Sequence, residues 1–147
     1  MLETYIISII AILLAYWSKY DKFRWCLPLA FIVITAFLSL GYEWGNDVPT
    51  YEREFERYTY SRYSLFDYQT YKYLNDKSEF GWVLIKQLCS GIGFYGMRAI
   101  LFSFENLVIY LMIKRVVPSK YYWFAVFVYV ANPHLMILSS SMMRQWL

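Results

Sequence analysis

The sequence predicts an all-α, polytopic membrane protein with about four transmembrane helices and two short amphipathic, interfacial or re-entrant helices in one external loop. Of its 147 residues, 59% are hydrophobic and 22% aromatic, whereas only 17% are charged, which is too apolar for a typical soluble domain. Long uncharged stretches alternate with short turns rich in Lys and Arg. Because a segment in lipid must satisfy its own backbone hydrogen bonds, these stretches are expected to be helical.

The predicted spans belong to a single membrane domain, residues 1–147, and are residues 4–18, 25–42, 99–113 and 121–141. The first stretch is short for a bilayer, but Glu3 and Lys19 can extend their charged ends toward water. The third carries Glu105, which must face protein or water because a carboxylate facing lipid costs several kcal/mol. An ion pair with Arg98, a bond between helices and a proton pathway all remain open for this acid.

The orientation follows from two dense basic turns, residues 19–24 and 114–120, which hold three Lys or Arg residues each. The positive-inside rule places both turns in the cytoplasm. The N-terminus and the loop of residues 43–98 are then outside. Cys26 and Cys89 lie toward opposite sides of the membrane, so no disulfide joins them.

The external loop begins with a predicted amphipathic helix. Pro49 suits its first turn, and Tyr51, Phe55 and Tyr58 then share one face. Such a helix is expected to lie on the membrane surface.

A second amphipathic helix is predicted to start near Ser78, a suitable N-cap, and to end near Gly91. Its expected apolar stripe consists of Phe80, Val83, Leu84 and Leu88. A helix of this length is too short to span a bilayer, so it is interfacial or re-entrant.

Three charged positions in or near the loop allow both a chemical and a structural interpretation. Asp47 is either a base at the membrane edge or the cap of the helix near Pro49. Glu79 is either an acid of the same site or a first-turn residue favoured by the helix dipole. Arg144 either binds a phosphate or extends its charge to the interface.

Other classes of function have little support in the sequence. The net charge of +3 does not indicate a nucleic-acid partner. Gly91, Gly93 and Gly96 do not have the spacing of a dinucleotide or phosphate loop, and no metal-ligand motif is present, so no cofactor or metal is expected.

Taken together, the motifs resemble the EpsG family, a group of bacterial membrane proteins similar to Wzy-type polysaccharide polymerases. The matching residues, in order, are Gly45-Asn46-Asp47 with Tyr51 and Phe55, Glu79-Phe80-Gly81-Trp82 with Leu84, and Met143-Arg144-Gln145. The family pattern has an Arg shortly before its Gly and Asp, where this chain has Tyr42 and Glu43. It also has a Pro after the Glu, where this chain has Phe80.

The resemblance implies a glycosyltransferase-type enzyme at the outer face of the bacterial cytoplasmic (inner) membrane, acting in exopolysaccharide, capsule or O-antigen synthesis. Its substrate would be an oligosaccharide linked to polyprenyl pyrophosphate, and other polysaccharide-assembly proteins would be partners. The reaction requires a base near the acceptor hydroxyl and cations near the departing pyrophosphate. The resemblance makes Asp47 and Glu79 the catalytic candidates, with substrate binding by Tyr51, Arg98, Arg144 and Gln145.

Members of this family continue through further spans after the Arg-Gln motif, so the chain is expected to be the N-terminal part of a longer polymerase. The alternative hypothesis is a non-catalytic small membrane protein, or a truncated remnant, that acts as an anchor or accessory subunit.

Overall fold

The computed structural model describes residues 2–41, 48–61 and 80–132. Throughout these ranges the secondary structure is helical and contains no β-strand, which confirms the predicted all-α class. The α-helices are α1 (Leu2–Trp17), α2 (Cys26–Leu40), α3 (Val48–Ser61), α5 (Phe80–Cys89), α6 (Gly93–Val116) and α7 (Tyr122–Ala131). Two short 3-10 helices, η1 (Asp21–Phe23) and η3 (Ser119–Tyr121), lie in the connections α1–α2 and α6–α7.

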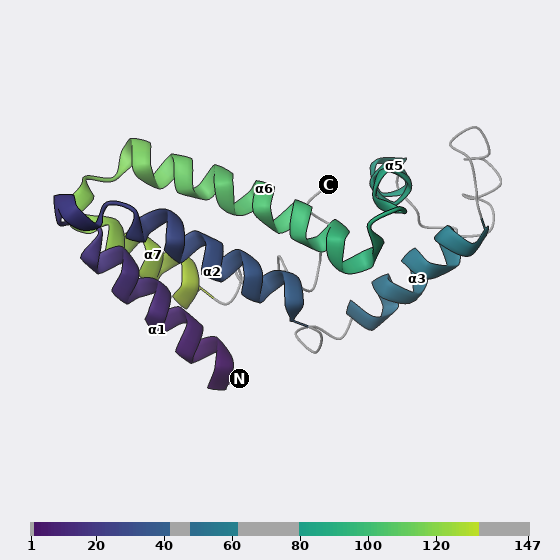
Figure 1. Ribbon diagram of the computed structural model, residues 1–147, viewed down its shortest axis with the longest axis horizontal. Coiled ribbons are helices and arrows are strands. Elements are labelled where there is room, and N and C mark those ends of the chain that lie inside the picture. Colours follow the sequence, from purple (N-terminus) through teal and green to yellow (C-terminus); the bar gives the residue numbers. More distant parts are fainter. Residues whose placement is uncertain (1, 42–47, 62–79, 133–147) are drawn as a thin grey trace.

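Helices α1, α2, α6 and α7 form an elongated bundle (Figure 1), in which α2 packs against α1 and α6, and α1 packs against α7. Ala11 and Ala15 of α1 and Ala30 of α2 are almost fully buried, and such small side chains allow helices to approach closely. Larger residues such as Ile34 and Phe102 fill the space between the helices. The core of the bundle therefore contains apolar residues from all four helices.

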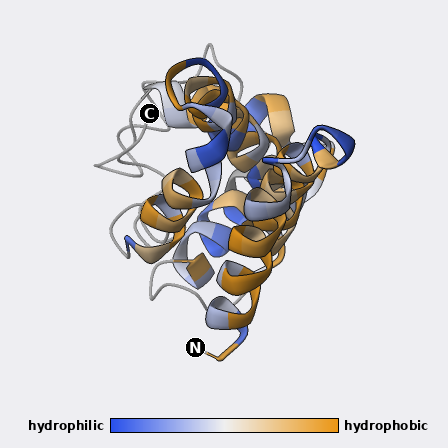
Figure 2. Cartoon of the chain, turned by 90° about the vertical axis from the view of Figure 1, so that its left-hand side faces the viewer, coloured by the Kyte–Doolittle hydropathy of each residue, from blue (hydrophilic) through white to orange (hydrophobic). Residues whose placement is uncertain are grey.

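The outside of the bundle is also apolar (Figure 2). Ile32 of α2 is 62% exposed, and Phe104 of α6 is 70% exposed. A soluble protein rarely exposes large apolar surfaces, whereas a membrane protein faces hydrocarbon with them. Within the described residues, two stretches are long and apolar enough to cross a bilayer, Asp21–Leu40 and Gly93–Val116.

These two stretches correspond to the second and third predicted spans. The first predicted span corresponds to α1, which is apolar but shorter. The fourth begins with α7, and its part beyond Asn132 lies outside the described residues.

The third span differs from the prediction at its N-terminal end, because α6 starts at Gly93 rather than near Ala99. The predicted span starts at Ala99 because Arg98 is the charged residue that precedes the uncharged run. In the structure Arg98 lies inside α6 and is fully buried. Its guanidinium donates to backbone carbonyls of α2, so the helix does not need to end before the charge.

Helices α3 and α5 pack against the N-terminal end of α6 (Figure 1). Pro49 occupies the first turn of α3, as predicted. The Phe55 ring of α3 is 6.0 Å from the Phe94 ring of α6, measured between centroids, and Phe55 is 3% exposed. The apolar face of α3 that was expected on the membrane surface thus packs, at Phe55, against protein.

The predicted apolar stripe of α5 is not one buried side, since Val83 is 1% exposed whereas Leu88 is 75% exposed. The buried face instead contains Trp82, Val83, Lys86 and Cys89, because this is the side of α5 that faces α3 and α6. The helix ends at Cys89, and a short turn leads to Gly93, whose φ of 78° is in the left-handed region.

Candidate functional site

Arg98 connects α6 to the C-terminal end of α2. Its Nη1 donates a hydrogen bond of 2.7 Å to the carbonyl of Gly41, and its Nη2 donates one of 2.7 Å to the carbonyl of Leu38. The last carbonyls of a helix have no partner within the helix and carry partial negative charge. The guanidinium therefore caps α2 with both hydrogen bonds and favourable charge.

Two aromatic rings enclose this guanidinium. Its central carbon is 5.9 Å from the ring centroid of Phe94 and 5.5 Å from that of Phe102, distances at which cations interact with aromatic faces. The carboxylate of Glu52 in α3 also interacts electrostatically with Arg98. The Nε of Arg98 is buried and has no hydrogen-bond partner among the described residues. Helices α2 and α6 thus meet at one buried cation.

A second buried cation lies in α5. Lys86 is 0% exposed, and its Nζ is 5.8 Å from the ring of Trp82, one helical turn earlier. The Trp82 ring in turn makes an edge contact with Tyr51 of α3, with centroids 5.8 Å apart. The indole Nε1 of Trp82 is buried, and no group in the described part of the chain accepts a hydrogen bond from it. The contact between α3 and α5 therefore combines two aromatic rings with a buried indole N–H that has no acceptor among the described residues.

The predicted site residues divide into two groups. Tyr51 and Arg98 are described, and both lie at the end of the bundle where α6 begins, in α3 and in the first turns of α6. Asp47, Glu79, Arg144 and Gln145 lie outside the described residues. Among the residues that are described, no group of His, Cys, Asp and Glu could hold a metal ion.

Lys86 was not identified from the sequence. The sequence does contain an indication of this residue. A Lys four residues after Trp82 in an otherwise apolar helix lies on the same helix face as the Trp82 ring. Without the tertiary structure, however, that face could not be distinguished from the face of Leu84 and Leu88.

Glu105 makes no salt bridge with Arg98, whose terminal nitrogens are bonded to carbonyls. Its neighbour Asn106 supplies the bond between helices instead. The Asn106 Nδ2 donates to the carbonyl of Phe102 at 2.9 Å, and the hydroxyl of Tyr129 in α7 donates to its Oδ1 at 3.0 Å. This polar contact fixes α7 against α6 inside the bundle.

The EpsG family model matches residues 24–147. The chain belongs to the EpsG family. The match to EpsG proteins includes α2 and every helix after it, together with all six candidate site residues. It confirms the resemblance inferred from the motifs and supports a role in polysaccharide assembly at a membrane. The comparisons with curated proteins and with solved structures found no match.

Proposed function

We propose that this EpsG protein is part of a membrane glycan polymerase that joins polyprenyl-pyrophosphate-linked repeat units in exopolysaccharide, capsule or O-antigen synthesis. The observation that carries the proposal is the match of the EpsG family over residues 24–147. The apolar exterior of the bundle further supports action on a substrate carried in the bilayer.

In the proposed reaction, Asp47 or Glu79 accepts the proton of an acceptor sugar hydroxyl. The hydroxyl oxygen then forms a bond to the anomeric carbon of the growing chain, and the bond from that carbon to the pyrophosphate oxygen breaks. Arg144 stabilises the negative charge that develops on the departing pyrophosphate. Tyr51 and Gln145 are proposed to contact the sugar or its carrier.

The contact between α3 and α5 supports a shared site for the two acids. Asp47 directly precedes Val48, the first residue of α3, and Glu79 directly precedes Phe80, the first residue of α5. Close to these helix starts, the Tyr51 ring of α3 contacts the Trp82 ring of α5. Chain connectivity therefore ties both carboxylates to one pair of packed helices.

For Arg98 we propose a supporting role in the same site. Its bond to the carbonyl of Gly41 holds the end of α2 from which the chain leads toward Asp47. Its buried charge also contributes a positive potential at this end of the bundle. Direct binding of pyrophosphate by Arg98 remains a prediction, and it would require the guanidinium to share donors with the α2 carbonyls.

The experiment that tests the proposal replaces Asp47 and Arg144 separately in the full-length protein of the source cell. D47A and R144A are expected to abolish long-chain polysaccharide while membrane levels of the protein stay unchanged. D21A and K120A are matched controls, because they remove one acid and one base from the opposite end of the bundle. Normal chain lengths in both site variants would contradict the proposal.

A further inference from the structure

A groove of about 520 Å³ lies between α2 and α6 on the lateral face of the bundle. It is lined by small side chains, Ala36 and Ser39 from α2 and Ala99 and Ser103 from α6, and by Ile32 and Leu107. Its volume is in the usual range of ligand pockets, about 300–1,000 Å³. Small residues on both helices create this space in the middle of the two longest apolar stretches.

The polar groups of α2 in the groove are bonded to their own helix. The Thr35 hydroxyl donates to the carbonyl of Phe31 at 2.8 Å, and the Ser39 hydroxyl donates to the carbonyl of Thr35 at 2.7 Å. Asn106 of α6 is likewise bonded to Phe102 and Tyr129. Since these groups are satisfied, the groove mainly presents hydrocarbon, which suits a hydrocarbon chain better than a sugar.

One end of the groove leads to a cation and an indole. On α6 the lining residue Tyr110 is followed one turn later by Lys114, whose Nζ is 5.6 Å from the Tyr110 ring. On α2 the lining residue Pro28 is preceded three residues earlier by Trp25, which is 59% exposed. Both therefore continue the lining faces of their helices beyond the groove.

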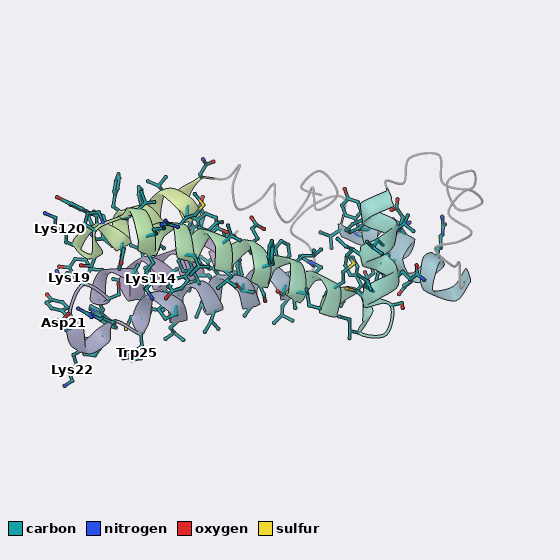
Figure 3. The ribbon with its side chains drawn as sticks, turned by 90° about the horizontal axis from the view of Figure 1, so that it is seen from above. Lys19, Asp21, Lys22, Trp25, Lys114 and Lys120 are labelled. Atoms are coloured by element: carbon teal, nitrogen blue, oxygen red, sulfur yellow. The ribbon has the colours of Figure 1, made fainter. Side chains whose placement is uncertain are left out.

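Lys114 belongs to a larger cationic surface, here called the basic end. It consists of Lys19, Lys22, Arg24, Lys114, Arg115 and Lys120. The fold brings its two parts, the α1–α2 connection and the region from the end of α6 to η3, to the same end of the bundle (Figure 3). The one acid in these turns, Asp21, is already paired with Arg24 at 2.6 Å. The Nζ of Lys19 lies over the Tyr16 ring, 3.7 Å from its centroid, and the interaction with the Tyr16 side chain raises the pKa of this amine.

We propose that the α2–α6 groove, together with Lys114 and Trp25 beyond its end, forms a binding site for an anionic phospholipid. An acyl chain lies in the groove, and the headgroup phosphate lies against Lys114 beside Trp25. The excess positive charge at one end of an apolar groove fits a lipid with a net negative headgroup, and Trp suits the headgroup layer. The proposal does not rest on the proposed polymerase activity, whose site lies at the opposite end of α2 and α6.

The charge requirement is tested by native mass spectrometry of the full chain in mild detergent. Phosphatidylglycerol and phosphatidylcholine with identical acyl chains are added at equal concentration. We expect higher occupancy by phosphatidylglycerol, and a loss of about fivefold in K114Q. K22Q is the matched control, since it removes one exposed lysine of the basic end that does not continue the groove. Equal occupancy by the two lipids, or equal effects of the two variants, would overturn the proposal.

The groove requirement is tested with S103F, which fills the groove. It is expected to lose occupancy by both lipids, whereas L111F adds the same ring at an exposed position of α6 that does not line the groove and leaves occupancy unchanged. Helical circular dichroism verifies that both variants are folded, and S103L replaces S103F if the latter does not fold. Unchanged binding in the groove variant rejects the site. Displacement of phosphatidylglycerol by an equal concentration of polyprenyl phosphate rejects the phospholipid as its occupant.

Discussion

Arg98 shows how one residue can combine a functional signal with a structural role. An arginine near the membrane edge of an apolar helix is expected to bind an anion or to extend to the interface. In the structure its side chain is fully buried and bonded to the carbonyls of Leu38 and Gly41. Two carbonyls at a helix C-terminus offer a guanidinium the negative potential that a phosphate would offer.

R98M is therefore expected to destabilise the protein itself. Methionine retains part of the apolar volume but leaves both carbonyls without the guanidinium, and a hydrogen bond to a charged group contributes about 1.5–3 kcal/mol. The expected loss is about 3 kcal/mol or more, observed as a lower Tm in detergent. R24M is the control, because the Arg24 side chain is 78% exposed. An unchanged Tm in R98M would show that the two bonds contribute little.

At the scale of elements, helices α3 and α5 were predicted from the sequence, but the helices against which they pack were not. Pro49 predicted the start of α3 within one residue, because proline suits a first helical turn. For α5, periodicity alone did not identify the side that packs against protein, since Val83 of the predicted stripe is buried and Leu88 is exposed. Apolar residues surround much of this helix, so only its neighbours α3 and α6 decide which of them are buried.

The junction of α5 and α6 depends on the backbone of Gly93, which has a φ of 78°. A Cβ at this position would meet no atom within 4 Å, so a substitution would cost backbone strain and not a clash. G93A is expected to lose about 1–2 kcal/mol of stability, measured as a decrease in Tm.

The matched control for this junction is G91A, two residues earlier in the same turn. A Cβ at Gly91 would likewise meet no atom within 4 Å, but the φ of Gly91 is not in the left-handed region. Similar Tm values for the two alanine variants would show that the conformation of Gly93 imposes no strain on the junction.

At the scale of the whole molecule, the two basic turns lie at one end and α3 and α5 at the other (Figure 1). This arrangement agrees with the predicted orientation, in which the basic turns are cytoplasmic and the α3–α5 region is external. The proposed polymerase site and the proposed lipid site are then on opposite sides of the membrane.

The orientation is tested with new cysteines, because the native ones are poorly suited to labelling. Cys26 and Cys89 are buried, and burial raises the pKa of the Cys89 thiol, so less of the reactive thiolate is present at neutral pH. In a background with both replaced by serine, K22C and G91C place thiols at exposed positions on the two ends.

A membrane-impermeant maleimide added to intact cells should label G91C and not K22C, and lysis should make both reactive. The reverse pattern would invert the orientation. In the unmodified protein, labelling of Cys89 is expected to be slow at neutral pH and faster at alkaline pH, because its raised pKa delays ionisation of the thiol.

The sequence by itself determined the helical class, the position of the apolar stretches and the membership of the EpsG family, because lipid imposes helices and the motifs are local in the chain. Only the tertiary structure decided that Arg98 caps α2, that Trp82 contacts α3 while Lys86 is buried, and that Lys114 lies one turn beyond the end of a groove. These features depend on contacts between residues far apart in the chain, such as Arg98 with Gly41, and periodicity within one helix carries no information about its neighbours.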